Sequence, residues 1–425
     1  MMFPDSKNLA ITVERQFPRT ISKASFPHRF GKYSEIKTSK FEFVFDLNGE
    51  LKFIRGLDVN WPHPAEQLKR TDGNDWVYYS VGDISGEGGI HSWMGEYYLP
   101  CLPYPSNAVW EINYFKNANI MGAFAEWSQL YANLYESQKE GLHPKSKELI
   151  SSILQNHDGV WYERSKKLNE IIGGRVSVLP PDARHVDYEI IPIMIADGCL
   201  YHCDFCCVKT AQKFQKRHRD NILEQVQQLK VHYGRNLENY NALFLGNHDA
   251  LAAGEELICF TASEAFKAFF VEEARAITPC LLLFGSVDSL LHSDNELFRK
   301  LNQLPYHTYI NIGFESINPS TLKIIGKPLD AGRVRAAFDK MLKVNSHFTN
   351  IEVSGNFLIG EQLLPEHYHS LAELLRTAPD NSHKKGAIYL SPLKDSPKKR
   401  ELLPRFFEIK SQSQLPVYIY LIQRL

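Results

Sequence analysis

The chain has 425 residues, of which 44% are hydrophobic and 23% are charged, and its formal net charge is −1. This balance excludes the overall positive field that draws many proteins to nucleic acid, so we do not expect nucleic acid as a partner. No apolar run approaches the roughly 20 residues that span a bilayer. The first 19 residues mix charges with prolines and lack the apolar core of a secretory signal. We therefore expect a cytoplasmic protein without a membrane partner, large enough for two or three domains.

The first 180 residues are rich in aromatic side chains and turns. Residues 41–45 alternate between apolar and polar, and Asn48 and Gly49 then favour the positive φ angles of a hairpin turn before a second strand at 51–54. The other expected elements are loops at 82–89 and 98–106 and helical patterns at 109–137 and 144–171. We predict an N-terminal α+β domain over 1–180, of unknown role, whose aromatic side chains form a core rather than a substrate groove.

After Pro180 and Pro181, short apolar runs alternate with helical patterns. Strands are expected at 189–196, 242–245, 280–285, 308–313, 351–359 and 386–390, with a further candidate at 417–422. Helices are expected at 221–233, 261–274, 295–303, 332–344, 366–377 and 399–409. Such alternation predicts an α/β fold, a partial (β/α)6-type barrel over 181–395 with a C-terminal helix and strand over 396–425. The functional site of such a fold lies at the carboxyl ends of the strands.

Four of the seven cysteines fall within nine residues, in the loop after the first of these strands. Cys199, Cys203 and Cys206 follow the spacing C-x3-C-x2-C, so three thiolates can hold three corners of a cubane iron–sulfur cluster. The fourth iron would then have no protein ligand, as is typical of a reactive site. Two alternatives remain, a structural zinc site completed by His202 or Cys207 and a group of buried free thiols.

The cysteine loop resembles the signature of the radical S-adenosylmethionine (SAM) superfamily. Phe205 stands directly before Cys206, so the pattern is C-x3-C-x-Phe-C, and Gly198 and the preceding strand match as well. The resemblance extends over roughly 185–390. Because the aromatic residue precedes Cys206, the resemblance favours Cys206 over Cys207 as the third ligand. Cys207 is then a buried neighbour or, alternatively, has a role on the substrate side.

This resemblance implies a radical SAM barrel with a [4Fe–4S] cluster on the three cysteines and with Phe205 beside the cofactor. In the family, the fourth iron binds the amino and carboxylate groups of SAM. The reduced cluster cleaves SAM to methionine and a 5′-deoxyadenosyl radical, which removes a hydrogen atom from the substrate.

Residues after the second and third strands resemble the SAM contacts of the family. Gly246 and Asn247 follow the second strand, where family members bind the amino group of SAM through a glycine-rich segment. A simple turn between strand and helix is the alternative. Ser286 follows the third strand and is expected at the same edge of the barrel.

Two later strands carry further candidates. Glu315 and Ser316 end the fourth strand in a Gly-x-Glu-Ser segment that resembles one seen in several branches of the family. A carboxylate there can accept bonds from ribose hydroxyls or from the α-ammonium group. The alternative for Glu315 is a salt bridge to Lys323 or Lys327. Asn356, inside the fifth strand, would contact the ribose, unless its partner is a backbone neighbour.

No motif identifies the substrate. The cysteines outside the loop are too scattered to predict an auxiliary cluster, and 1–180 lacks a cobalamin-binding Asp-x-His-x-x-Gly. We expect an enzyme that acts on a small metabolite, cofactor precursor or peptide, with flavodoxin or ferredoxin as an electron donor. The alternatives are a [4Fe–4S] and SAM-binding protein that delivers a cofactor, and an RNA-modifying enzyme whose basic run at 209–219 meets phosphates.

Overall fold

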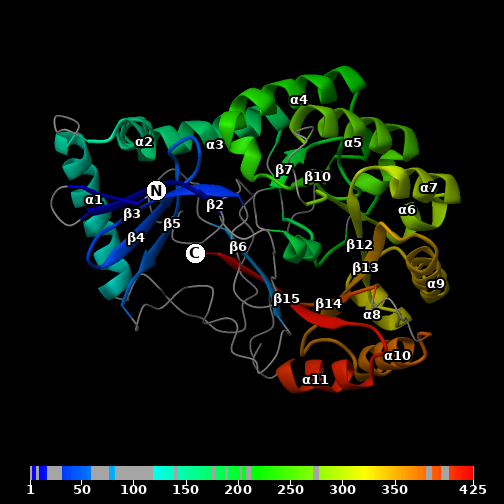
Figure 1. Ribbon diagram of the computed structural model, residues 1–425. Coiled ribbons are helices and arrows are strands. Elements are labelled where there is room, and N and C mark those ends of the chain that lie inside the picture. Colours follow the sequence, from blue (N-terminus) through cyan, green and yellow to red (C-terminus); the bar gives the residue numbers. More distant parts are fainter. Residues whose placement is uncertain are drawn as a thin grey trace.

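The computed structural model of the chain contains two large sheets and the helices that cover them (Figure 1). The described residues are 2–5, 9–16, 31–58, 76–81, 118–137, 142–174, 176, 178–186, 190–201, 203–206, 212–270, 277–379, 385–393 and 402–424. Of the helices within these ranges, none combines the length and the apolar character that crossing a membrane requires. The loops predicted at 82–89 and 98–106 lie outside the described residues.

The N-terminal sheet is an antiparallel meander in the order β1-β2-β3-β4-β5. Its strands are β1 (Met2–Asp5), β2 (Leu9–Gln16), β3 (Lys32–Lys37), β4 (Phe41–Phe45) and β5 (Leu51–Gly56). The predicted hairpin is confirmed, because β4 and β5 pair antiparallel across the turn at Asn48 and Gly49. Gly49 has a φ of +81°, which favours glycine. Asn48 does not have a positive φ, so the prediction of positive φ angles holds for Gly49 and is wrong for Asn48. The Asp46 carboxylate accepts the backbone N–H groups of Asn48 and Glu50, each at 2.9 Å, and so closes the turn.

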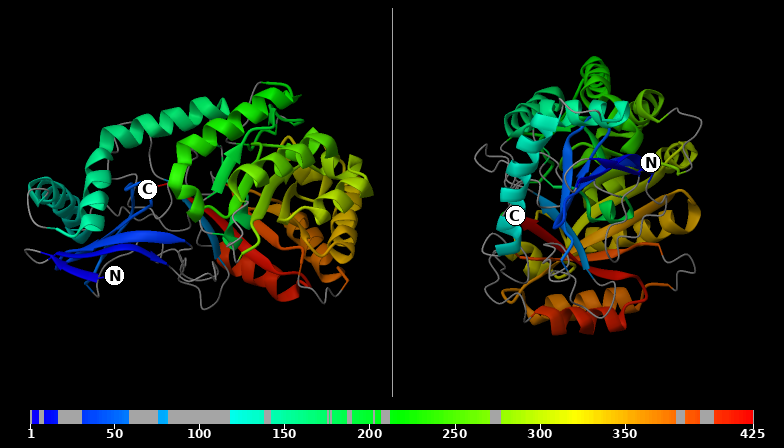
Figure 2. Two further views of the ribbon diagram at one scale, coloured as in Figure 1. Left: turned by 45° about the horizontal axis from the view of Figure 1, so that its top comes forward. Right: turned by 60° about the vertical axis from the view of Figure 1, so that its left-hand side comes forward.

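Helices α1 (Ala118–Ser137) and α2 (Pro144–Gln155) cover one face of this sheet, as Figure 2 shows. Phe43 and Phe45 of β4 both face Trp127 of α1, with ring centroids 5.7 and 6.0 Å apart. The helical pattern predicted over 144–171 is two helices, because the chain leaves the helical conformation at Asn156 before α3 (Asp158–Ile172) begins.

The larger sheet is parallel throughout, in the order β6-β15-β14-β13-β12-β11-β10-β7. Its strands are β6 (Trp76–Val81), β7 (Ile190–Ile193), β10 (Ala242–Leu245), β11 (Cys280–Gly285), β12 (His307–Glu315), β13 (Ile351–Ile359), β14 (Ile388–Pro392) and β15 (Val417–Arg424). Seven of these strands succeed one another along the chain, and β6 and β7 are the two edges of the sheet. The predicted α/β fold with a partial barrel is therefore confirmed.

The sheet has eight strands, two more than the six-unit pattern in the sequence. β15 is the further candidate strand, and β6 comes from the region that we assigned to an N-terminal domain. β6 pairs in parallel with β15, with Trp76 opposite Ile419 and Val81 opposite Arg424. The aromatic and β-branched residues of β6 favour a strand, but its local pattern does not determine which sheet it joins. The N-terminal region thus contributes to both sheets, and the domain limits at 180 and 395 stay predictions.

Helices follow the strands of the barrel and cover its outer face (Figure 1). They are α4 (Arg219–Tyr233), α5 (Glu255–Phe269), α6 (Val287–His292), α7 (Asn295–Gln303), α8 (Pro319–Ile324), α9 (Ala331–His347), α10 (Pro365–Arg376) and α11 (Leu402–Gln412). Three 3-10 segments lie among these elements, namely η4 (Pro181–His185) before β7, η5 (Gly234–Asn239) after α4 and η6 (Ala250–Ala253) before α5. The sequence did not predict α6 and α8, because helices of six residues are too short to show a 3.6-residue period.

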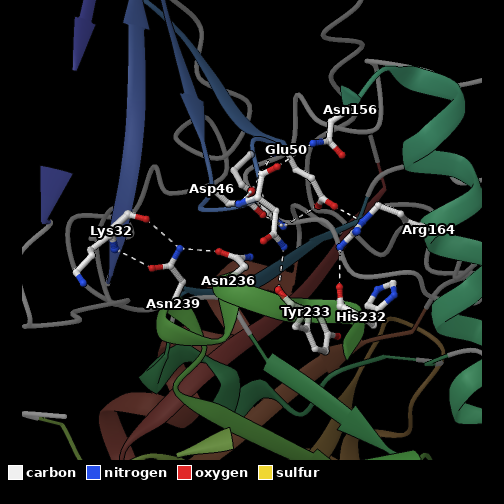
Figure 3. Close-up of polar contacts among 11 residues, drawn as sticks. Lys32, Asp46, Glu50, Asn156, Arg164, His232, Tyr233, Asn236 and Asn239 are labelled. Carbon is white, nitrogen blue, oxygen red and sulfur yellow. Dashed lines mark hydrogen bonds and ion pairs between the residues drawn. The ribbon is translucent and has the colours of Figure 1, made fainter. Parts of the chain in front are cut away.

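A polar junction joins the N-terminal sheet to the helices of the barrel (Figure 3). The side chain of Asn48 donates to the backbone carbonyl of Tyr233 at 2.8 Å. Arg164 of α3 donates to the carbonyl of His232 at 2.9 Å and pairs with the Glu50 carboxylate. Burial, together with the neighbouring cations Arg164, Lys52 and Lys167, lowers the pKa of His232 to about 4.

The same junction includes a reciprocal contact at η5 (Figure 3). The Asn239 carboxamide accepts the backbone N–H of Lys32 at 2.7 Å and donates to its carbonyl at 3.0 Å. Asn239 also donates to Asn236 at 2.7 Å. Because Asn239 is fully buried and fully bonded, this contact fixes the register of β3 against the barrel.

Candidate functional site

The cysteine loop leaves the barrel through a short two-stranded stem. β8 (Ala196–Asp197) pairs antiparallel with β9 (Gln215–Lys216). Arg217 follows β9, and its guanidinium donates to both carboxylate oxygens of Asp197, at 2.8 and 2.6 Å. The same guanidinium donates to two backbone carbonyls at the end of α3. This forked pair holds both ends of the loop together.

Gly198 allows the loop to cross its own returning strand. Its φ is +77°, and a Cβ atom added there would lie 2.3 Å from the carbonyl oxygen of Lys213. That clash is with backbone, so a side chain at 198 would displace the loop. The conformation of the cysteine loop therefore depends on this glycine.

The three predicted ligands lie along one short turn. Cys203 is buried, and Cys199 and Cys206 are half-buried. The Sγ atom of Cys199 accepts the backbone N–H of Tyr201 at 3.4 Å. Burial raises the pKa of Cys203 to about 11, and the cation of Lys327 opposes that rise. Iron binding replaces these protons, because thiolate is the form that binds a metal.

The donor set fits a cubane cluster. Among the described residues, no three His, Cys, Asp or Glu side chains converge closely enough to hold one metal ion. In a cubane, each thiolate binds a different iron, so its ligands surround the cluster instead of meeting at one centre. His202 and Cys207, which the zinc alternative needs, lie outside the described residues. The three thiols of the loop suit a cluster with one iron left open.

The far side of the loop rests on the turn after α8. The backbone N–H of Asp204 donates to the carbonyl of Ile325 at 3.2 Å. Gly326 has a φ of +64°, and a Cβ atom there would lie 2.3 Å from the Asp204 carboxylate. This close approach brings the next residue, Lys327, beside the cysteines.

Lys327 is a buried cation at this edge of the barrel. Its Nζ donates to the carbonyl of Gly313 at 2.6 Å and lies 3.3 Å from Oε1 of Glu315. The two side chains are only 4% and 12% exposed, and Nζ lies 5.6 Å from the centre of the Tyr201 ring. Glu315 has a φ of +65° at an irregularity in β12, a conformation that side chains rarely adopt. The salt bridge that the sequence offered as an alternative is therefore present, with Lys327 as the partner, and a contact from Glu315 to SAM stays a prediction.

The loop after β10 brings a buried carboxylate to the same edge. Gly246 has a φ of +74°, and a Cβ atom there would lie 2.7 Å from that of Ala250. Asn247 is half-buried, whereas Asp249 is only 2% exposed. Oδ1 of Asp249 accepts the backbone N–H of Ser286 at 3.1 Å, but Oδ2 has no hydrogen-bond partner within the described ranges. Burial raises the pKa of Asp249.

Ser286 lies beside this carboxylate, as its predicted place after β11 requires. Its hydroxyl caps α6 by accepting the N–H of Ser289 at 3.0 Å, and Ser289 returns the bond to the Ser286 backbone. The hydroxyl of Tyr201 accepts the N–H of Asp288 at 3.1 Å. The start of α6 is thus bonded directly to the cysteine loop.

Ser316 points away from the site. Its hydroxyl lies 2.8 Å from Nδ1 of His367 and accepts the N–H of Asn318 at 3.0 Å. Nε2 of His367 lies 2.9 Å from the carbonyl of Leu358, so Nε2 carries the proton and Nδ1 accepts from Ser316. Ser316 is fully buried and its hydroxyl is fully used. Any contact from Ser316 to a cofactor would have to come from its backbone.

Asn356 and Phe205 are the remaining predicted site residues. Asn356 of β13 is half-buried, and its Nδ2 donates to Oδ1 of Asn311 at 2.5 Å. Its partner is thus a side chain, not the backbone neighbour that the sequence suggested. Oδ1 of Asn356 is buried and has no partner in the described part of the chain. Phe205 is half-buried and packs against the barrel core.

Two charged groups that the fold places here, Asp249 and Lys327, were not among the site residues predicted from the sequence, where Lys327 stood only as a salt-bridge partner for Glu315. The charges of Asp249 and Lys327 both act on the Cys199 thiol, although these residues are far apart in the chain. Asp249 could have been predicted from the sequence, because it is an acidic residue shortly after a buried strand. The sequence gives less reason to place Lys327 at the site, since this residue stands in a turn between helices.

Comparison with known proteins finds a family match within the barrel region. The profile of the radical SAM superfamily matches residues 193–375. No curated protein matches the chain. Three similar solved structures are the coproporphyrinogen III oxidase HemN from Escherichia coli (14% identity, 51% of this chain, 46% of that chain, TM-score 0.35), the methyltransferase TsrM from Kitasatospora setae (12%, 56%, 38%, 0.34) and a radical SAM methyltransferase from Sphaerobacter thermophilus (17%, 54%, 66%, 0.34). The chain thus spans less than half the length of the first two and about two thirds of the third.

The family match and the cysteine loop together define the class of protein. Residues 193–375 of the chain match this family and form a radical SAM domain. Domains of this family bind a [4Fe–4S] cluster and SAM.

Proposed function

We propose that the enzyme cleaves SAM reductively at a cluster held by Cys199, Cys203 and Cys206 and uses the 5′-deoxyadenosyl radical to abstract hydrogen from its substrate. The observation that carries this proposal is the position of the three thiols against the buried pair of Lys327 and Glu315. When bound, the reduced cluster supplies the electron that breaks the sulfonium bond.

The charged groups around the loop suit the methionine part of SAM, which carries one carboxylate and one ammonium group. Lys327 can bind the carboxylate, and Glu315 and Asp249 can accept the ammonium, because opposite charges attract strongly in a site with little water. Asp249 suits this role because its Oδ2 atom is buried and lacks a partner among the described groups. Such an oxygen is costly to leave unsatisfied. The proposed neighbours of this part of SAM are Gly246, Asn247 and Ser286.

The cluster ligands can be tested by iron and sulfide analysis with EPR on the anaerobically reconstituted full chain. Cys203→Ala should lose the [4Fe–4S] signal. Cys259→Ala is the matched control, since Cys259 is half-buried on α5 and should retain full iron content. A full signal from Cys203→Ala would refute the ligand assignment.

The reaction can be tested with the reconstituted protein, SAM and dithionite. 5′-Deoxyadenosine should form, and its formation should depend on the cluster. A full cluster without 5′-deoxyadenosine would contradict the radical reaction and favour a cluster protein that delivers a cofactor.

The proposal extends to partners in general terms. We propose that the substrate is a small metabolite, cofactor precursor or peptide. We further propose flavodoxin or ferredoxin as the electron donor and a cytoplasmic location. Replacement of dithionite by a reduced flavodoxin or ferredoxin should support 5′-deoxyadenosine formation. RNA modification is not favoured by any described contact.

A further inference from the structure

A line of hydrogen-bonded side chains crosses the inside of the barrel from η4 to Asn356. The Ser354 hydroxyl donates to Oδ2 of Asp182 at 2.6 Å. Asn311 donates to Oγ of Ser354 at 2.8 Å, and Asn356 donates to Oδ1 of Asn311 at 2.5 Å. We call these four side chains, Asp182, Ser354, Asn311 and Asn356, the relay. It joins the segment before the first barrel strand to the fifth strand of the predicted series.

The relay lies on the inner face of the sheet. Asn311 of β12 stands opposite Ser354 of β13 in the parallel register. Side chains along a strand alternate between faces, and Phe314 and Phe357 occupy the other face. There, Phe314 stacks on Phe357 at 5.4 Å and meets Phe338 of α9 at 5.9 Å. The relay therefore points away from the helices, toward the inside of the barrel.

One end of the relay decides the direction of every bond in it. An ionised Asp182 can only accept, so the Ser354 proton must point to it. The Ser354 oxygen then accepts from the N–H of Asn311, which must turn its own oxygen toward Asn356. Asn356 therefore uses its N–H inside the relay and turns its oxygen away from Asn311. This fixes an amide orientation that coordinates alone leave ambiguous.

The surroundings of Asp182 support the carboxylate form. The Tyr389 hydroxyl donates to Oδ1 at 2.8 Å, and the nearby guanidinium of Arg184 bonds the same hydroxyl. Burial raises the pKa of Asp182 on balance, and Ser354, Arg184 and Tyr389 oppose that rise. The hydrogen bonds nevertheless favour the carboxylate form, because the Tyr389 hydroxyl already accepts from Arg184 and so donates its own proton to Asp182. A protonated Asp182 could donate to Ser354 and reverse every bond of the relay.

We propose that Asp182 is a positioning residue that presents the Oδ1 atom of Asn356 as a hydrogen-bond acceptor for a hydroxyl of bound SAM. The relay holds this oxygen buried and without a protein partner in the described structure, so a donor on the ligand completes it. The identity of that ligand rests on the proposed function, whereas the direction of the relay does not.

The test uses pairs of variants in the full chain, measured by thermal unfolding and, after anaerobic reconstitution, by equilibrium SAM binding. Asn356→Asp should lower the unfolding midpoint and weaken SAM binding about tenfold or more, because two acceptors then face each other at Asn311. Adding Asp182→Asn should restore both readouts, because an N–H at 182 reverses the relay and lets Asn311 donate to the new carboxylate.

Glu352→Gln is the matched control for charge. Glu352 is a buried carboxylate whose charge acts on Tyr389 together with that of Asp182, yet it bonds the N–H groups of Gly386 and Ala387 and stands outside the relay. Combined with Asn356→Asp, it should restore neither readout, since it removes a charge without reversing a bond.

Each outcome decides a separate point. Additive defects in Asp182→Asn/Asn356→Asp, or an equal rescue by Glu352→Gln, would overturn the relay. If Asn356→Asp lowered the unfolding midpoint and Asp182→Asn restored it, but Asn356→Asp left SAM binding unchanged, the role of Asn356 toward SAM would be overturned. If the wild-type chain bound no SAM, the proposed function and the ligand would both fail, and the unfolding midpoints would still decide the direction of the relay.

Discussion

Replacing Lys327 by methionine should weaken both the barrel and its hold on SAM, because the substitution leaves the carboxylate of Glu315 buried without its cation. Methionine keeps an unbranched side chain of similar length, so the packing against Tyr201 changes little. The bond from Nζ to the carbonyl of Gly313 is lost as well. The perturbation is therefore mainly electrostatic.

The geometry sets the size of the effect. At 3.3 Å between Nζ and Oε1, the attraction at an effective dielectric constant of about 20 is roughly 5 kcal/mol before desolvation. Removing one partner of a buried pair costs about 3–5 kcal/mol. We expect the lower value for Lys327→Met, about 3 kcal/mol, because Glu315 is partly exposed. For a barrel of this size, that corresponds to a fall of roughly 6–12 °C in the unfolding midpoint.

The assay compares unfolding midpoints and SAM affinity for Lys327→Met, Glu315→Gln and the double variant. Glu315→Gln should cost only about 1 kcal/mol, since Lys327 keeps its bond to Gly313. The double variant should be more stable than Lys327→Met, because no carboxylate is left unpaired. SAM binding should weaken roughly 10- to 100-fold in Lys327→Met. A wild-type midpoint together with wild-type SAM affinity for Lys327→Met would refute the reasoning.

Three further predictions concern the supports of the site. Gly198→Ala should reduce the iron bound on reconstitution to less than about half, because a side chain meets the Lys213 backbone, and full iron content would show that the loop can move. Arg217→Lys should lower stability by about 1–2 kcal/mol in chemical denaturation, since lysine cannot form the forked pair with Asp197, and an unchanged transition would argue against that clamp. His232 is neutral when folded, and its pKa rises on unfolding from about 4 toward 6.5. Stability should thus decline by roughly 3 kcal/mol as pH falls through this window, and His232→Asn should flatten the profile, whereas an unaltered profile would assign the acid sensitivity elsewhere.

The sequence by itself determined the class of fold and the chemistry of the loop. Short apolar runs with a two-residue period and helical runs with a 3.6-residue period are local properties, so β10, β11 and β13 appear with their predicted bounds. The spacing of the three cysteines is local as well, and it predicted the radical SAM domain without any tertiary contact. Patterns within a few residues are therefore readable from the chain alone.

The tertiary structure alone decided which distant residues meet. β6 pairs with β15 because β15 is left unpaired on one side once the other strands have assembled. The sequence of β6 alone does not show this. Lys327 lies beside the cysteines because Gly326 lets two turns approach closely. The Ser316 side chain points away from the site because its hydroxyl bonds to His367. Such contacts join residues tens to hundreds of positions apart, and their energies depend on burial, which only the folded chain sets. The sequence therefore predicted three cysteine ligands, and the fold decided which charges lie near them.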